Sequence, residues 1–181
     1  MKDKLLLHCC CAPCSSAILE EYSEVFDITL YFCNPCITNK DEYDLRAKEV
    51  KRLVKEMNVN VGVVIADYTP QVFYSDTHYM EEIPEGGKRC KVCYSQRLYM
   101  TAQYAKEKGF EYFSTTLTIS PYKNSAIIND IGGNIGRSND VMYMPFDFSY
   151  LYKRSLELSK QYNLYQQNYC GCEYSKKDTN S

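Results

Sequence analysis

Short apolar segments alternate along the chain with longer segments of helical periodicity, and this alternation limits the folds that the chain can adopt. The apolar segments are rich in β-branched and other apolar residues, as buried strands are. They cover residues 4–8, 27–32, 61–66, 111–115 and 141–145. Strands separated by helices are typical of a mostly parallel sheet with helices on both faces. We therefore predict an α/β fold of this kind.

The segments between the predicted strands have the pattern of amphipathic helices. In the clearest one, residues 41–57, apolar side chains recur at positions 50, 53, 54 and 57, while lysine and arginine fill the opposite side. A second helix is expected over residues 90–108, with Gly109 as its stop. Further helices are expected at 15–22, 124–131 and 150–162.

Length and composition fit a single domain. The chain has 181 residues, of which 45% are hydrophobic, enough to bury one core. We expect one α/β domain over residues 1–175 and a disordered tail over residues 176–181. A formal net charge of -2 excludes a broadly basic polyelectrolyte but leaves room for a local patch that binds phosphates. The apolar runs are too short for a secretory signal or a membrane span, so we expect a cytoplasmic protein without a membrane partner.

Four of the ten cysteines follow directly after the first predicted strand, in the stretch HCCCAPC. Ligands of open α/β sheets bind beyond the carboxyl ends of the strands, so this stretch lies where a ligand is expected. Gathered thiolates repel one another unless a metal ion or a disulfide takes up their charge. In a reducing cytoplasm, metal binding or redox chemistry is favoured over a disulfide framework.

The other six cysteines form three pairs. They are Cys33 and Cys36, Cys90 and Cys93, and Cys170 and Cys172. The middle pair is a C-x-x-C at the start of a predicted helix, where backbone amides and the helix dipole favour thiolate. Gly171 lets the backbone bend so that both sulfurs of the last pair face one centre. One zinc ion or one four-iron cluster takes at most four thiolates, so two adjacent metal sites fit these cysteines better than one.

Five separated motifs extend over nearly the whole chain. They are HCCCAPC, NP followed by EYDLR, RCKVCYSQRL, TTLTISPYKN and YCGCEYS. In this order they resemble the QueH type of the epoxyqueuosine reductase family. The resemblance implies an α/β fold of the adenine nucleotide alpha hydrolase-like (HUP) kind, with a C-terminal cysteine-bearing segment, that holds a [4Fe-4S] cluster beside a second metal ion. It also implies the last step of queuosine biosynthesis, in which the epoxide on the modified wobble base of a tRNA is reduced to an alkene.

The family's cysteines, carried over by position, give the expected ligands. They are Cys10, Cys11, Cys90, Cys93, Cys170 and Cys172, joined by Cys14 at a position where relatives carry a cysteine or a carboxylate. The sequence does not assign each sulfur to one metal. We expect the cluster to be held by Cys90 and Cys93, with one or both of Cys11 and Cys170. We expect the second metal ion, an iron, to lie among Cys10, Cys14 and Cys172.

The remaining cysteines and His8 fall outside this ligand set. Relatives resemble Asn-Pro-Asn-Ile-His-Pro where this chain has NPCITN, which makes Cys36 a substitution in a substrate loop and Cys33 a strand thiol. Cys9 replaces a residue that is usually apolar. His8 ends an apolar strand and is expected to be a core histidine with one hydrogen bond rather than a metal ligand.

The implied reaction defines further site residues and partners. Turning an epoxide into an alkene takes two electrons, two protons and the loss of one oxygen as water; a cluster supplies electrons, and an iron with an open position acts as a Lewis acid. The candidate proton donors are Tyr122, Lys123, Asp147 and Tyr169. The basic residues expected to contact phosphates are Lys88, Arg89, Lys91 and Arg97. The resemblance implies a tRNA partner that has a GUN anticodon and carries epoxyqueuosine, and an external electron donor.

Two other classes of protein stay open at this point. A tRNA sulfurtransferase of the nucleotide alpha hydrolase type shares the fold and the cluster, but it needs ATP and a Ser-Gly-Gly phosphate loop, which this sequence lacks. A non-catalytic zinc-binding module would instead use the later cysteine pairs as a structural zinc site. Metal analysis separates a zinc module from an iron enzyme.

Overall fold

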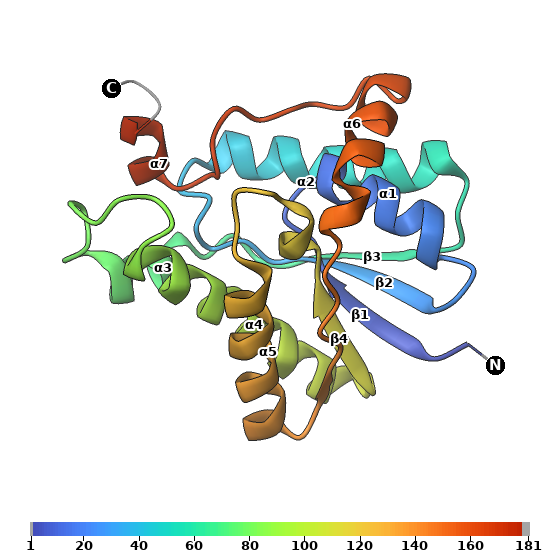
Figure 1. Ribbon diagram of the computed structural model, residues 1–181, viewed down its shortest axis with the longest axis horizontal. Coiled ribbons are helices and arrows are strands. Elements are labelled where there is room, and N and C mark those ends of the chain that lie inside the picture. Colours follow the sequence, from blue (N-terminus) through green and yellow to red (C-terminus); the bar gives the residue numbers. More distant parts are fainter. Residues whose placement is uncertain (1, 179–181) are drawn as a thin grey trace.

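The computed structural model describes residues 2–178, and the strands in this range form one parallel sheet (Figure 1). The strands lie in the order β3-β2-β1-β4-β5. They are β1 (Lys4–His8), β2 (Asp27–Phe32), β3 (Gly62–Ile65), β4 (Tyr112–Thr115) and β5 (Met142–Tyr143). Because neighbouring strands are parallel, their carboxyl ends all meet at one edge of the sheet.

Helices cover both faces of this sheet (Figure 1). One face carries α1 (Ala12–Tyr22), α2 (Lys40–Met57) and α6 (Tyr152–Gln161). The other face carries α4 (Lys88–Lys108) and α5 (Ser125–Asn139). The shorter elements are α3 (Pro70–Thr77), α7 (Glu173–Asp178) and the 3-10 helices Thr116–Ile119 and Ser149–Leu151. In the described range, no helix has both the length and the apolar character that crossing a membrane requires.

Successive residues of β1 point into two separate cores. Leu5 and Leu7 pack into the core beneath α1, α2 and α6, whereas Leu6 packs into the core beneath α4 and α5. This follows from the two-residue repeat of a strand, which sends neighbouring side chains to opposite faces. Because both faces are covered, the strand has no solvent side, and its sequence is a continuous apolar run.

The predicted fold class, a parallel sheet with helices on both faces, is confirmed. Each predicted strand is present within two residues of its expected bounds. Helices α3 and α7 were not expected, because elements of eight and six residues are too short to show a helical period. Helix α7 includes the first part of the expected tail, and residues 179–181 lie outside the described range. The division into a domain over residues 1–175 and a tail stays a prediction.

Helix α5 extends well beyond its predicted end at residue 131. The helix continues through Gly132 and Gly133 to residue 139. A Cβ on Gly132 would fall inside the buried ring of Tyr143, and one on Gly136 would lie 2.7 Å from the Val141 carbonyl oxygen. The two glycines therefore let α5 pack closely on β5 instead of ending the helix.

We expect alanine to have opposite effects at the adjacent glycines of α5. Gly132→Ala must displace the Tyr143 ring and should lower the free energy of unfolding by about 1–3 kcal/mol. At Gly133 the nearest atom to an added Cβ is an Arg137 nitrogen at 3.6 Å, so alanine fits there without a clash. Gly133→Ala should therefore raise the free energy of unfolding by up to about 1 kcal/mol, because alanine has the higher helix propensity. Urea unfolding of the metal-free variants measures both effects. Equal stability of the two variants would contradict the packing described for α5.

Candidate metal centre

The candidate site lies at the carboxyl ends of β1 and β4, where open α/β sheets bind ligands because the strand order changes direction there. His8 ties three strands together at this point. Its Nδ1 lies 2.8 Å from Thr115 Oγ1 at the end of β4, and its Nε2 lies 3.1 Å from the Cys33 carbonyl oxygen after β2. Burial lowers the pKa of His8 to about 4, so the ring is neutral at neutral pH. The predicted core role of His8 is confirmed, with a second hydrogen bond.

Three thiols gather where β1 leads into α1. The sulfur atoms of Cys10, Cys11 and Cys14, here termed the thiol triad, all lie within 4.8 Å of one another. Cys11 caps α1, because its Sγ accepts a hydrogen bond from the Cys14 amide at 3.4 Å. The first helical turn thus brings Cys14 back beside Cys11, with their sulfur atoms 2.7 Å apart.

The triad concentrates its negative charge on Cys10. Hydrogen bonds from the Cys11 and Cys14 thiols hold the pKa of Cys10 well below its usual range. The bond to Cys10 raises the pKa of Cys14, and burial raises the pKa of Cys11 to about 12. The triad therefore loses a proton most easily at Cys10, and Cys11 and Cys14 hold their protons more tightly. A soft metal ion can occupy such a site by displacing those protons.

A second set of thiols lines a cavity near the triad. This set, here termed the thiol pocket, consists of Cys36, Cys90, Cys93, Cys170 and Cys172. Cys90 and Cys93 lie in the first two turns of α4, and the Gly86 amide donates a hydrogen bond to Cys90 Sγ at 3.2 Å. Cys36 comes from the loop after β2 and lines the pocket together with Cys93. Interaction with the Cys93 thiol lowers the pKa of Cys36 to about 6, and interaction with Cys36 raises the pKa of Cys93.

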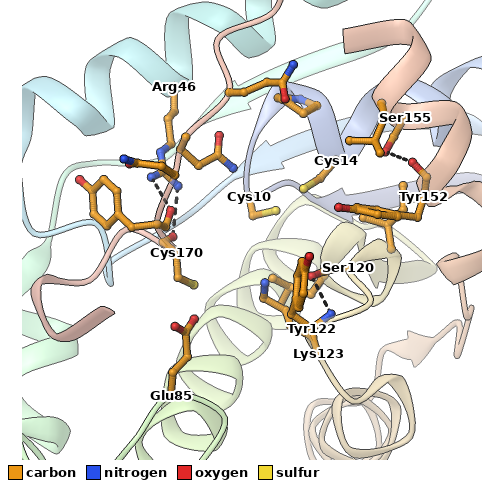
Figure 2. Close-up of a pocket in the computed structure, with 18 of the residues that line it drawn as sticks. Cys10, Cys14, Arg46, Glu85, Ser120, Tyr122, Lys123, Tyr152, Ser155 and Cys170 are labelled. Carbon is orange, nitrogen blue, oxygen red and sulfur yellow. Dashed lines mark hydrogen bonds between the residues drawn. The ribbon is translucent and has the colours of Figure 1, made fainter. Parts of the chain in front are cut away.

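Arg46 of α2 fixes the segment that carries Cys170 (Figure 2). Its Nη1 donates to the Cys170 carbonyl oxygen at 3.1 Å, and its Nη2 donates to the Tyr169 carbonyl oxygen at 3.2 Å. An ion pair with Glu42 at 2.6 Å orients the guanidinium, which is almost completely buried. Gly171 follows with a φ of 124°, a conformation that other residues rarely adopt. The last part of the chain is thereby held against α2 next to the thiols.

Two cations lie among the thiols. Arg97, 1% exposed, donates from Nε to the Cys93 carbonyl oxygen at 3.4 Å, and its Nη2 has no hydrogen-bond partner among the described residues. Burial opposes its charge, but the neighbouring cysteines, Cys36 first, raise the pKa of Arg97 well above its usual value. Burial also opposes the charge of Lys123, but interaction with the nearby Cys170 raises its pKa. Both cations stay charged and favour negative charge beside them.

A cavity of about 560 Å³ lies between the triad and the thiol pocket (Figure 2). Cys10 and Cys14 face it from one side, and Cys170 faces it from the other. Lys123 also lines the cavity, as does Glu85, for which no sequence pattern predicted a role. Its volume suits a small organic ligand. Thiols, a cation and space for a ligand therefore meet at this edge of the sheet.

The structure brings the seven expected cysteine ligands to this edge in a grouping that differs from the expected one. Cys11 lies in the triad rather than with Cys90 and Cys93. Cys172 lines the thiol pocket and does not belong to the triad. The reason is local, since Cys11 caps the same helix that carries Cys14. Which thiols bind which metal stays a prediction.

Cys36, which the sequence comparison set aside, lies inside the thiol pocket. The C-x-x-C spacing of Cys33 and Cys36 after the second strand could have indicated this placement. Only Cys36 of the pair lines the pocket. Cys33 is a buried thiol 3.8 Å from Met100 Sδ. Cys9 is buried beside Ser15, with 3.0 Å between Sγ and Oγ. Cys9 and Cys33 thus lie outside both thiol groups.

The candidate proton donors are not all at the cavity. The three that line it are Tyr122, Lys123 and Tyr169. Asp147 is not among the described residues that line it. Its carboxylate accepts hydrogen bonds from the Ser149 amide and the Ser125 hydroxyl, both at 3.0 Å, and these bonds lower its pKa. This placement argues against Asp147 as a proton donor.

Of the four basic residues expected to contact phosphates, two are exposed and two are buried. Lys88 and Lys91 are exposed in the first turn of α4. Arg89 and Arg97 are each 1% exposed, and Arg89 donates to the Met80 carbonyl oxygen at 2.9 Å. The helical period turns both arginines toward the interior. The expected phosphate contacts therefore do not fit Arg89 and Arg97, and they stay a prediction for Lys88 and Lys91.

Comparison with known proteins matches almost the whole chain to a family. The family described as "Epoxyqueuosine reductase QueH" matches residues 5–178. A protein named epoxyqueuosine reductase QueH from Streptococcus pyogenes serotype M1 is 44% identical over an alignment of 183 positions, and the match covers 98% of this chain and 72% of that relative. Proteins of the same name from Staphylococcus epidermidis and Thermotoga maritima are 40% and 35% identical. These matches cover 96% and 94% of this chain and 76% and 89% of the relatives.

Removing the Arg46 guanidinium should loosen the segment around Cys170. Arg46→Met leaves two carbonyl oxygens without their donor, which should cost about 1–3 kcal/mol of unfolding free energy. We expect faster amide hydrogen exchange in residues 166–172, measured by mass spectrometry. Arg52→Met is the matched control, because Arg52 also joins α2 to carbonyl oxygens, those of Tyr162 and Asn163, both at 3.0 Å. Unchanged exchange at residues 166–172 in Arg46→Met would contradict the role given to Arg46.

Proposed function

Because the chain belongs to the epoxyqueuosine reductase QueH family, we propose that its cavity is the place where the epoxide of epoxyqueuosine in tRNA is reduced to the alkene of queuosine. The chain is thus an oxidoreductase of tRNA modification. The reaction consumes two electrons and two protons and releases the epoxide oxygen as water. The observation that carries this proposal is the pair of thiol groups that adjoin one ligand-sized cavity.

The thiol pocket fits a [4Fe-4S] cluster by its donor atoms and by its charge. Thiolates are the usual ligands of such clusters, and the pocket offers Cys90, Cys93, Cys170 and Cys172. A cluster with four thiolate ligands is an anion. Arg97 supplies a buried cation whose Nη2 finds no acceptor among the described residues, as expected of a group that faces a bound anion.

The thiol triad fits the second metal ion, and we propose that this ion is iron. Three soft sulfur ligands leave a coordination position open for substrate. When bound, the cluster and the iron supply electrons and a Lewis acid for the epoxide oxygen. The sequence-based expectation counted Cys11 among the possible cluster ligands and placed Cys172 at the second metal ion. We propose the reverse for these two cysteines, because the structure groups them differently.

The chain's own residues bind the modified base and balance its charge. Lys123 places a positive charge beside the cavity and favours the oxygen atom that gains negative charge as the epoxide opens. Since its pKa is raised, Lys123 releases a proton reluctantly, and binding the oxygen suits it better than donating protons. Tyr122 is 86% exposed beside the cavity, where its ring can stack on an unpaired base. Glu85 lines the cavity from an exposed loop and can pass protons from solvent.

The RNA partner is a tRNA that has a GUN anticodon and carries epoxyqueuosine. A wobble base becomes accessible when it leaves the anticodon stack, and the cavity then has room for it. Lys88 and Lys91 are exposed close to Glu85 and Gly86 of the cavity wall, where phosphates of the anticodon loop would lie. The two electrons come from an external donor, which reloads the metal centre after each turnover.

The protein purified without oxygen should contain iron and sulfide and should reduce epoxyqueuosine in tRNA with dithionite as electron source. Cys90→Ala and Cys172→Ala should each lose the visible absorption of the cluster and lower turnover by more than about 100-fold, because each removes a ligand. Cys33→Ala is the control, since Cys33 is a buried thiol outside both thiol groups. Full colour and turnover in both ligand variants, or zinc as the metal of the wild type, would refute the proposal.

Lys123→Met tests whether Lys123 stabilises the reacting oxygen atom without being needed for metal binding. We expect it to keep wild-type iron and sulfide and to lower single-turnover reduction by roughly 100- to 1,000-fold, the usual loss when one stabilising donor is removed. Lys153→Met, a change on α6 outside the cavity lining, is the control and should leave the rate unchanged. A normal rate in Lys123→Met would exclude Lys123 from the reaction.

A further inference from the structure

The surroundings of Cys36 are those of a buried pocket residue and not those of a residue in a substrate-binding loop. It is completely buried, and it shares the thiol pocket with Cys90, Cys93, Cys170 and Cys172. A cysteine in a substrate loop would be expected to face the open cavity, but Cys36 is not among the residues that line that cavity in the described part of the chain. It instead faces the same small pocket as Cys93.

The loop that carries Cys36 is tied down on both sides of it. The Asn34 side chain donates to the Cys9 carbonyl oxygen at 2.9 Å, and the Ile37 amide donates to the Asn34 carbonyl oxygen at 3.1 Å. The Thr38 carbonyl oxygen accepts a hydrogen bond from Tyr68 at 2.7 Å. These bonds fix the backbone around Cys36. The position of its thiol in the pocket is therefore a built feature of the fold.

Arg97 is a second, independent indication that the part of the pocket around Cys36 holds an anion. The side chain is 1% exposed, lines the pocket, and has an Nη2 without a hydrogen-bond partner among the described residues. It shares the pocket lining with Cys36 and Cys93. A buried donor of this kind normally has an acceptor. A cluster bound at these two thiols would provide one.

We propose that Cys36 is a metal-site thiol of this chain that can take the ligand position of Cys93. The inference rests on the proposed [4Fe-4S] cluster and names a residue beyond its expected ligand set. A cluster takes four thiolates, and the pocket contains a further thiol beside them. Because Cys36 and Cys93 line the same small pocket, a small shift of either side chain brings its sulfur to the same metal atom.

The test is to remove the two thiols separately and together, under anaerobic reconstitution with iron and sulfide. Iron, sulfide and the electron paramagnetic resonance spectrum of the dithionite-reduced protein are measured for Cys93→Ala, Cys36→Ala and the double variant. We expect each single variant to keep at least half of the wild-type iron and sulfide, with a shifted spectrum in Cys93→Ala. The double variant should lose nearly all of the sulfide and keep only the iron of the triad. Cys93→Ser is measured in parallel, because serine preserves the size of the buried side chain.

The control double variant replaces Cys33 and Cys36, and it should keep the cluster because Cys93 is intact. If Cys93→Ala and Cys93→Ser lose as much of the cluster as the double variant does, the proposal that Cys36 can replace Cys93 as a ligand is overturned. Retention in the variant without Cys36 and Cys93 would overturn it too. A wild-type protein that binds zinc and no sulfide would instead overturn the proposed cluster, and this inference with it. The wild-type measurement thus separates failure of the proposed function from failure of the role of Cys36.

Discussion

Buried thiolates repel one another and lose their hydration, so the two thiol groups of this chain can share one sheet edge only with positive charge beside them. Arg97 and Lys123 supply part of that charge, and bound metal ions would supply the rest. The rest of the site follows from this requirement. Arg97 comes from α4 and Lys123 from the loop before α5, so both helices must pack on the sheet at fixed positions. The glycines of α5 and the Arg46 contacts to the Cys170 segment secure these positions.

The parallel sheet explains how distant cysteines come together. Residues after β1, after β2 and at the start of α4 reach the same edge because parallel strands present their carboxyl ends together. The segment after α6 crosses this edge and adds Cys170 and Cys172 (Figure 1). One end of the site is consequently buried and rich in sulfur, and the other opens toward Tyr122 and Glu85. This arrangement suits a reaction in which a metal centre acts on a base that belongs to a large RNA.

Periodicity and cysteine spacing were sufficient to predict the fold class, the strands and the edge at which the thiols meet. They were insufficient for side chains whose direction depends on packing. Arg97 lies seven positions after Cys90 on the same helix face, a spacing that indicates burial with the thiols, but its charge suggested a phosphate contact. Cys36 lies in an irregular loop, where no period defines which way a side chain points. The predicted helix ended at residue 131, because the close approach of α5 to β5 at Gly132 has no signal in local sequence.

The central claim is that the triad and the thiol pocket hold separate iron sites that face one cavity. Diffraction data collected on both sides of the iron K edge, from crystals of anaerobically reconstituted protein, test it most directly. The account predicts a strong anomalous peak among Cys90, Cys93, Cys170 and Cys172, and a second, weaker peak within the triad of Cys10, Cys11 and Cys14. A single zinc position, or iron bound away from either thiol group, would contradict it.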